Sequence, residues 1–273
     1  MKTLANHLIL FDNECPMCFA YTKAFTKLKM LPVDGREAYQ NMPEEVCPFV
    51  DKKRAANEIA LVNKETGEVT YGIESLFKVI ETSFPIFKTL FRFSPFLWIA
   101  QKCYAFISYN RKVIIPAEVN ANNIQPDFSL KHRLMFLFLT WLITSFILTN
   151  YTQHLTDFIP IGYKYREYMI CGTQIFFQGF IIYLNKKDKL FSYLGNMMTI
   201  SFAGALLLII PLILNNWIEV HPIFYLLYFL FTAGLMFLEH IRRSKILGLN
   251  LVMSFTWVFY RLIVLGVILV LAL

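Results

Sequence analysis

The stretch HLILFDNECPMC, residues 7–18, decides the fold expected for the first half of the chain. Its opening run, HLILF, is short and apolar, which predicts one buried strand. Cys15 and Cys18 follow after a turn, and Pro16 suits the first position of a helix that begins there. A strand, a turn and a helix with two cysteines at its start predict an α/β domain with a reactive site at the turn.

A cysteine at a helix N-terminus ionises more easily than a free one. It faces unsatisfied backbone N–H groups and the positive end of the helix dipole, which favour thiolate over thiol. We expect Cys15 to be the nucleophile and Cys18, one turn on and more buried, to be the resolving thiol. Pro16 shapes the loop. The predicted chemistry is dithiol–disulfide exchange with a protein or small-molecule thiol or disulfide, without a cofactor.

Asp12 lies one turn before Cys15, and its role depends on its burial. A buried Asp12 near the thiols could accept a proton from Cys18, whereas an exposed one would oppose ionisation of Cys15. A helix-capping carboxylate is an equally good interpretation. The sequence leaves these roles open.

Three other chemistries compete with thiol exchange. Structural zinc needs four ligands, usually in two pairs, and only Cys47, Cys103 and His7 could complete the set, so we expect no metal site. An apolar strand ending in Asp-x-Asp is typical of haloacid-dehalogenase-type phosphatases, but Glu14 takes the second position here. An inert remnant of a redox site is the last alternative.

The rest of the first half alternates between helical and strand patterns. We expect, in order, a helix at 18–31, a polar loop region at 41–57, strands at 58–62 and 69–71 joined by a hairpin turn, and a helix at 74–80. Residues 84–95 are aromatic, basic and broken by proline, so they do not span a bilayer. A helix covering the sheet and an interfacial helix with Lys88 and Arg92 near lipid headgroups are both open.

The spacing Asp12-x-x-Cys15-x-x-Cys18 resembles the signature of the DCC family of thiol-disulfide oxidoreductases, named for these residues. Two more segments extend the resemblance. Residues 71–75 look like the family's glycine-then-small-residue helix entry, and residues 104–111 like its closing Tyr…Asn-Arg helix. The resemblance implies a thioredoxin-like domain in which Cys15 and Cys18 carry the redox role.

This resemblance covers roughly residues 6–116 and has two departures. Asn13 stands where many members have glycine. No proline immediately precedes the strand at 58–62, where thioredoxins place a cis-proline beside the thiols. Docking of a substrate in the thioredoxin manner is therefore not implied.

Composition separates the two halves of this chain of 273 residues, which is 56% hydrophobic with a net charge of +7. Residues 1–133 hold 17 Lys and Arg against 14 Asp and Glu, an ordinary globular balance. Residues 134–273 hold nine against five, set between long apolar runs, as in a membrane protein. The chain has no Gly-rich phosphate loop, RNA-binding signature or dense basic stripe, so we expect no nucleic-acid partner.

Five membrane spans are predicted, near 134–150, 167–184, 196–215, 222–240 and 251–273. Eight basic residues fall on one side and two on the other: Lys131, Arg133, Lys186, Lys187, Lys189, Arg242, Arg243 and Lys245 against Lys164 and Arg166. The positive-inside rule then places the N-terminal domain in the cytoplasm and the C-terminus outside. The first apolar run is too short for a cleavable signal peptide.

Inside the spans, Arg261 lies near mid-membrane, where an unpartnered charge costs at least a few kcal/mol. Gln174 and Gln178, one turn apart on the second span, reach a similar depth and could bond it, either as a functional pathway or as a structural clamp. His240 is expected to be solvated at the inner end of the fourth span. Cys171 is alone in the spans, so an intramolecular two-cysteine relay is not expected.

We therefore expect a thioredoxin-like α/β domain at residues 1–118, a linker at 119–130 and an all-α transmembrane bundle of five spans at 131–273. The expected function is a membrane-tethered thiol–disulfide oxidoreductase acting on the cytoplasmic side. The alternative is a non-catalytic membrane anchor or transporter-like protein that uses the N-terminal domain as a binding module.

Overall fold

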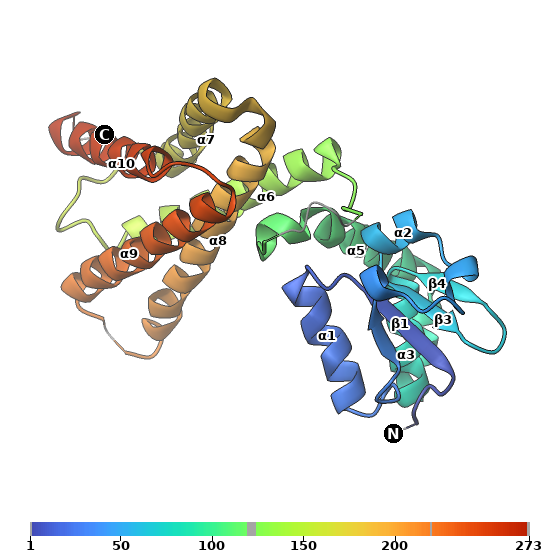
Figure 1. Ribbon diagram of the computed structural model, residues 1–273. Coiled ribbons are helices and arrows are strands. Elements are labelled where there is room, and N and C mark those ends of the chain that lie inside the picture. Colours follow the sequence, from blue (N-terminus) through green and yellow to red (C-terminus); the bar gives the residue numbers. More distant parts are fainter. Residues whose placement is uncertain (1, 119–123, 219, 272–273) are drawn as a thin grey trace. The chain divides into compact units, whose positions relative to one another are not determined.

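The structure is a computed structural model that describes residues 2–118, 124–218 and 220–271. The chain divides into two compact units between His132 and Arg133. The first unit holds a sheet with helices, and the second consists of long helices (Figure 1). Of the predicted linker, residues 119–123 lie outside the described residues, and residues 124–129 form no helix or strand.

A small mixed sheet forms the centre of the first unit. Its strands are β1 (His7–Phe11), β2 (Arg36–Ala38), β3 (Ala60–Asn63) and β4 (Val69–Tyr71). They lie in the order β2-β1-β3-β4, with β1 parallel to β2 and antiparallel to β3, and β3 antiparallel to β4. The central strand β1 is buried along its whole length, which explains its uninterrupted apolar run.

The strands are joined and covered by short and long helices. These are α1 (Pro16–Lys27), η1 (Tyr39–Asn41), η2 (Cys47–Phe49), α2 (Lys52–Asn57), α3 (Ile73–Ser83), η3 (Pro85–Phe87), α4 (Lys88–Arg92) and α5 (Ser94–Ile114). The predicted strands at 58–62 and 69–71 and the predicted helix at 74–80 match β3, β4 and α3, each with shifted ends.

The first helix is shorter than the sequence predicts. We expected it to run to about Leu31, but α1 ends at Lys27. Lys29 adopts a positive φ of 56°, and the chain then turns inward so that Met30 and Leu31 join the core. The apolar side chains of Met30 and Leu31, which suggested a longer helix, instead bury the turn that follows α1.

Two elements of this unit escaped the sequence prediction. Strand β2 has only three residues and lacks an apolar alternation. Helix α2 lies in the predicted loop region and begins with the basic run at Lys52. Asp51 caps it, because its side chain accepts a hydrogen bond of 3.0 Å from the Arg54 backbone N–H.

The two faces of β1 carry two separate core clusters. Leu8 and Leu10 point to one face and join Tyr39 and residues of α2. Ile9 and Phe11 point to the other face, where the cluster also contains Cys15, Cys18, Ile59, Leu61 and Val79. The period-two alternation of a strand therefore places both cysteines in the core beneath α1.

The second unit consists of α6 (Leu130–Thr152), α7 (Arg166–Lys186), η4 (Lys187–Lys189), α8 (Leu190–Leu214), α9 (Pro222–Ile246) and α10 (Val252–Leu271). Helix α6 begins three residues before the boundary. Four helical stretches of the described chain are long and apolar enough to cross a membrane, which is consistent with a multi-pass membrane protein. The sequence predicted five spans, and the difference lies in α7 and α8.

Helices α7 and α8 form a single 49-residue stretch, Arg166–Leu214, interrupted only at η4. The backbone breaks helical geometry at Lys186, where φ is −150° and ψ is 81°. Beyond that break α8 folds back on α7, and the Tyr193 hydroxyl donates a 2.8 Å hydrogen bond to Gln178 Oε1. Figure 1 shows the two helices meeting at this turn.

Candidate functional site

The two cysteines of the CxxC stretch lie at the N-terminus of α1. Cys15 is the N-cap residue, with extended backbone angles, and Pro16 is the first helical residue. The Cys15 Sγ accepts a hydrogen bond of 3.2 Å from the Cys18 backbone N–H. The sulfur therefore satisfies one of the free N–H groups of the helix, the contact that favours its negative form. All five cysteines are free thiols.

These contacts pull the acidities of the two thiols apart. The pKa of Cys15 is lowered to about 7, first by the hydrogen bond from the Cys18 thiol and then, against the effect of burial, by the Cys18 N–H and the Arg111 charge. The pKa of Cys18 is raised, because its hydrogen bond to Cys15, its burial and the charge of Cys15 all disfavour a second thiolate. The pair therefore loses its first proton near neutral pH, mainly from Cys15.

Asp12, at the end of β1, forms a buried ion pair with Arg111 of α5. The Arg111 Nη2 lies 2.8 Å from Asp12 Oδ2, and the two side chains are 5% and 3% exposed. The other carboxylate oxygen accepts hydrogen bonds from the Glu14 backbone N–H at 3.0 Å and from Gln40 Nε2 at 2.9 Å. The charge of Asp12 is thus compensated within the core.

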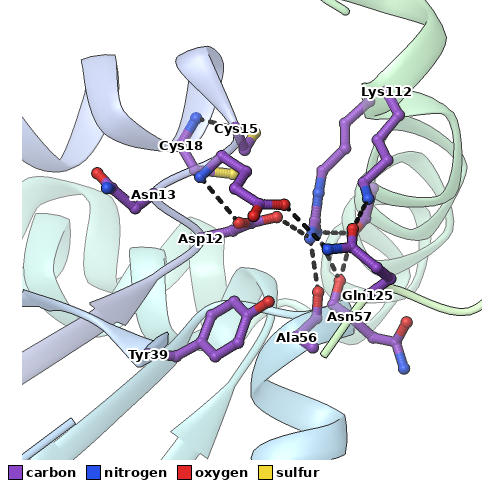
Figure 2. Close-up of polar contacts among 12 residues, drawn as sticks. Asp12, Asn13, Cys15, Cys18, Tyr39, Ala56, Asn57, Lys112 and Gln125 are labelled. Carbon is purple, nitrogen blue, oxygen red and sulfur yellow. Dashed lines mark hydrogen bonds and ion pairs between the residues drawn. The ribbon is translucent and has the colours of Figure 1, made fainter. Parts of the chain in front are cut away.

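Arg111 is fixed by several acceptors besides Asp12. Its Nη1 donates to the Asn57 carbonyl at 2.9 Å and to Ser108 Oγ at 3.1 Å, and its Nη2 donates to the Ala56 carbonyl. Burial alone would lower its pKa, but Cys18, Asp12 and Cys15 raise it overall. Figure 2 shows Asp12 at the centre of this network, with the cysteines on one side and Ala56 and Asn57 on the other.

The structure distinguishes between the roles left open for Asp12. It does not cap α1, since Cys15 holds the N-cap position. It is buried rather than exposed, and its charge still opposes ionisation of Cys15, although the hydrogen bonds from Cys18 and the Arg111 charge act in the other direction. Among the described residues, the Asp12 carboxylate accepts hydrogen bonds from the Glu14 N–H, Gln40 and Arg111 and not from a cysteine side chain. Its role as a proton acceptor for Cys18 therefore has no direct hydrogen bond behind it.

The expected difference in burial between the cysteines is absent. We expected Cys18 to be the more buried thiol, but Cys15 is 6% exposed and Cys18 is 7% exposed. Both belong to the apolar cluster under α1, because the turn after β1 folds inward over the sheet. Little of Cys15 is therefore open to solvent.

Two tyrosines line the inner side of the thiol pair. Tyr21, one turn into α1, hydrogen-bonds the Cys18 thiol, and burial raises its pKa well above the ordinary value. The Tyr104 hydroxyl accepts a 3.0 Å hydrogen bond from the Ile59 backbone N–H, and burial raises its pKa as well. Both hydroxyls are therefore neutral near physiological pH.

Residues 71–75 and 104–111, the two further segments of the family resemblance, both contribute contacts around the thiol pair and Asp12. Gly72 has a φ of +65°, and its N–H donates to the Ile59 carbonyl at 2.8 Å. A Cβ on Gly72 would meet Glu58 Oε2 at 3.1 Å, so both the backbone angle and the space favour glycine. Tyr104 and Arg111, quoted from the sequence only as parts of a motif, contact Ile59, the residue before β3, and Asp12.

Sequence reasoning gave no role to Arg111, Tyr21 or Gln40. For Arg111 a signal existed, because a single arginine follows the aromatic and apolar side chains of a predicted helix and needs a buried partner. Nothing in the sequence pointed to Gln40, which reaches Asp12 from η1.

The described part of the predicted linker packs against the first unit beside the site. Gln125 Nε2 donates to Glu14 Oε2 at 3.0 Å, and the Lys112 ammonium donates to Gln125 Oε1. Asp127 N–H donates to Asn57 Oδ1 at 2.6 Å. Figure 2 shows Gln125 and Lys112 next to the Asp12 network. Residues 124–127 are therefore part of the domain surface.

Neither a family model, nor a curated protein, nor a solved structure matches this chain. Among residues 2–118, 124–218 and 220–271, no three His, Cys, Asp or Glu side chains gather as metal ligands would. The assignment of a function depends on the geometry around Cys15.

In the second unit, the expected polar set is only partly assembled. Arg261 Nη2 lies 3.5 Å from Gln174 Oε1, a long contact, and its guanidinium lies 3.8 Å from the centre of the Trp257 ring. Gln178 bonds other partners, namely the Tyr193 hydroxyl and Thr256 Oγ1. The structure thus brings Arg261 and Gln174 together and gives Gln178 to a different network.

His240 belongs to that second network, and the expectation that it is solvated is wrong. It is 1% exposed, with its Nε2 3.1 Å from the Tyr193 hydroxyl and its Nδ1 2.9 Å from Ser254 Oγ. The apolar side chains of α9 and α10 cover it, and Trp257 stacks on its ring at 5.1 Å. A buried histidine with two hydroxyl partners is a satisfied core residue.

Proposed function

We propose that the protein is a membrane-tethered thiol–disulfide oxidoreductase of the DCC family, with Cys15 as nucleophile and Cys18 as resolving thiol. The observation that carries the proposal is the position of Cys15, whose sulfur caps α1, accepts the Cys18 N–H and has its pKa lowered to about 7. A thiolate at neutral pH is the species that attacks a disulfide.

The arrangement of the sheet supports a thioredoxin-like assignment for the first unit. The strand order β2-β1-β3-β4, the parallel β1–β2 pair and the antiparallel β3 and β4 are those of a minimal thioredoxin-like domain. Such domains also place their thiols between the first strand and the first helix, as here. One difference is that the described residues contain no cis peptide bond, whereas thioredoxins place a cis-proline beside the thiols.

The proposed reaction transfers two electrons between dithiol and disulfide. The Cys15 thiolate attacks one sulfur of a substrate disulfide, forming a mixed disulfide and releasing the other sulfur as a thiolate that takes up a proton. Cys18 then loses its proton and attacks Cys15 Sγ, which releases the second substrate thiol. The substrate is reduced, and Cys15 and Cys18 are left as a disulfide. The reverse sequence oxidises a dithiol.

The surrounding residues support this reaction without a cofactor. Arg111 stabilises the Cys15 thiolate through its charge, and Asp12 holds Arg111 in place. Tyr21 hydrogen-bonds the Cys18 sulfur and lowers its pKa, which favours the thiolate that attacks the mixed disulfide, and the proton that Cys18 gives up passes to the departing substrate thiolate. The proposed substrates are protein or small-molecule thiols and disulfides.

The second unit is proposed to hold this site at the cytoplasmic face of a membrane. Counting α7 and α8 as separate spans gives five crossings, which the 49-residue length of their joint stretch supports, since about 20 residues suffice for one crossing. The excess of basic residues on one side supports a cytoplasmic N-terminal domain and an external C-terminus.

The test is to trap the mixed disulfide with the full-length Cys18→Ser variant. Without the resolving thiol, Cys15 stays linked to its substrate, and non-reducing electrophoresis after acid quenching should show adducts that dithiothreitol removes. Cys15→Ser and the matched Cys103→Ser variant, which alters an exposed thiol away from the site, are the controls. Adducts that persist in Cys15→Ser, or none in Cys18→Ser, would contradict the proposal.

One observation favours the second candidate, a non-catalytic binding module on a membrane anchor or transporter-like protein. Cys15 is only 6% exposed, which is low for a nucleophile. A binding module predicts that Cys18→Ser yields no adducts while the double variant Cys15→Ser/Cys18→Ser keeps the cellular function of the protein. Thiol exchange predicts that the double variant loses it.

A further inference from the structure

Residues 84–99 expose an unusual concentration of large apolar side chains. We call these seven residues the aromatic patch: Phe84, Ile86, Phe87, Leu90, Phe93, Trp98 and Ile99. Ile86 is 84% exposed and Trp98 is 61% exposed. Residues 2–83 expose only four large apolar side chains among those described, and they are scattered over the unit: Phe19, Leu28, Val33 and Phe49. Concentrated apolar exposure of this kind marks an interaction site.

The segment is folded, so its exposure is not that of a loose chain. Its inner side chains pack against α3, where the rings of Phe77 and Phe91 stack at 3.9 Å with an angle of 3° between their planes. Phe96 at the start of α5 lies 5.9 Å from Phe77. The segment therefore uses one set of aromatic rings to attach to the unit and presents a second set outward.

The charged residues within the segment that carries the aromatic patch are all positive, and Glu74 of α3, which accepts a 2.8 Å hydrogen bond from Gln101, is a carboxylate close by. Lys88, Arg92 and Lys102 are exposed, and Lys102 lies over the Trp98 ring at 5.9 Å. The sequence has no Asp or Glu between Glu81 and Glu118. An outward aromatic surface with a mainly basic border fits an apolar partner that carries negative charge at its edge.

We propose that the aromatic patch docks the first unit onto an anionic lipid surface. The aromatic and aliphatic side chains enter the boundary between headgroups and acyl chains, while Lys88, Arg92 and Lys102 contact the lipid phosphates. The same chain carries helices long and apolar enough to cross a membrane, which makes a lipid surface a natural partner for the first unit. The helices of this segment are not among those stretches, so they lie on a bilayer instead of crossing it.

Photocrosslinking in the full-length chain tests this docking. The residue p-benzoylphenylalanine is placed at Ile86, and the protein is reconstituted into phosphatidylcholine vesicles with or without phosphatidylglycerol. After irradiation, the mass of the protein reports lipid adducts. The matched control carries the same probe at Val33, which is 93% exposed and outside the aromatic patch. We expect several-fold more lipid adduct at position 86 than at position 33, and more with phosphatidylglycerol.

Charge reversal separates the lipid from other partners. Lys88→Glu with Arg92→Glu should reduce the adduct at position 86 in anionic vesicles several-fold. The control pair Lys23→Glu with Lys27→Glu, on α1, changes the net charge equally and should leave it unchanged. Crosslinks from position 86 to residues 133–273, to a second copy of the chain, or in equal yield from positions 86 and 33 would each overturn the proposal.

Discussion

Arg111 in the first unit and Arg261 in the second unit are held in very different ways. Arg111 in the first unit has a carboxylate at 2.8 Å and further acceptors at the carbonyls of α2 and at Ser108. Among the described residues, Arg261 in the second unit contacts one amide oxygen at 3.5 Å and the face of Trp257. One charge is built into a network, and the other has a single weak acceptor.

The difference shows which polar group the fold depends on. A buried ion pair contributes little net stability, but removing one partner leaves an uncompensated charge. The stability of the first unit should therefore fall on any change at Asp12 or Arg111, and such a change would also alter the charges next to the thiol pair. Replacing Arg261 should change the stability of the second unit little, because its weak contacts offset only a small part of the desolvation cost of its charge.

The largest effect is expected from Asp12→Ala. This change leaves the Arg111 guanidinium buried without its carboxylate, which costs about 3–5 kcal/mol of unfolding free energy in the first unit. The measurement is a urea titration of the full chain in detergent, followed by alkylation of the buried Cys15 and Cys18. Asp34→Ala, which removes an exposed carboxylate paired with Lys64, should leave the transition in place. Equal transitions for the two variants would show that the ion pair is not structural.

A smaller loss is expected from Gln40→Leu. It removes the 2.9 Å hydrogen bond to Asp12 Oδ1 while the Glu14 N–H and Arg111 remain as donors. A hydrogen bond to a charged group contributes about 1.5–3 kcal/mol, so the variant should lie between wild type and Asp12→Ala in the same titration. If Gln40→Leu loses as much unfolding free energy as Asp12→Ala, the network depends on the Gln40 amide more than on the Asp12 charge.

The smallest effect on stability is expected from Arg261→Leu. Replacing a weakly partnered charge among apolar helices by leucine should change the stability of the second unit by about 0–1 kcal/mol, in either direction, because the desolvation cost disappears with the charge. Thermal unfolding of the full chain in detergent checks this, and Arg111→Leu is the matched substitution in the first unit. A loss at Arg261 as large as that at Arg111 would show that the comparison is wrong.

The strand and the cysteine pair were predictable because they depend on local sequence. The apolar run of β1 reads directly as a buried strand, and CxxC after a turn reads as a helix start, since N-terminal capping involves neighbouring residues only. The hairpin between β3 and β4 was predictable for the same reason: the Asn63 side chain accepts the N–H groups of the turn, and Gly67 supplies the positive φ.

Features that depend on distant contacts were not predictable. The carboxylate of Asp12 meets Arg111 across 99 residues of chain, so its three possible roles could not be separated by spacing. From the sequence, His240 is expected to be a solvated residue at the inner end of the fourth span, and its burial follows from Tyr193 and Ser254 on two other helices. Strand β2 depends on its pairing with β1, because its three residues lack a strand pattern of their own.

The central claim is that Cys15 is a thiolate near neutral pH, and its ionisation can be measured directly. In the reduced full-length protein, the rate of alkylation of Cys15 by iodoacetamide is followed by mass spectrometry as a function of pH. A lowered pKa shifts the rise in rate to lower pH, so we expect a midpoint near 7, and a higher midpoint in Cys18→Ala, which lacks the thiol that donates to Cys15. A midpoint at or above the free-cysteine value of about 8.5 would contradict the account.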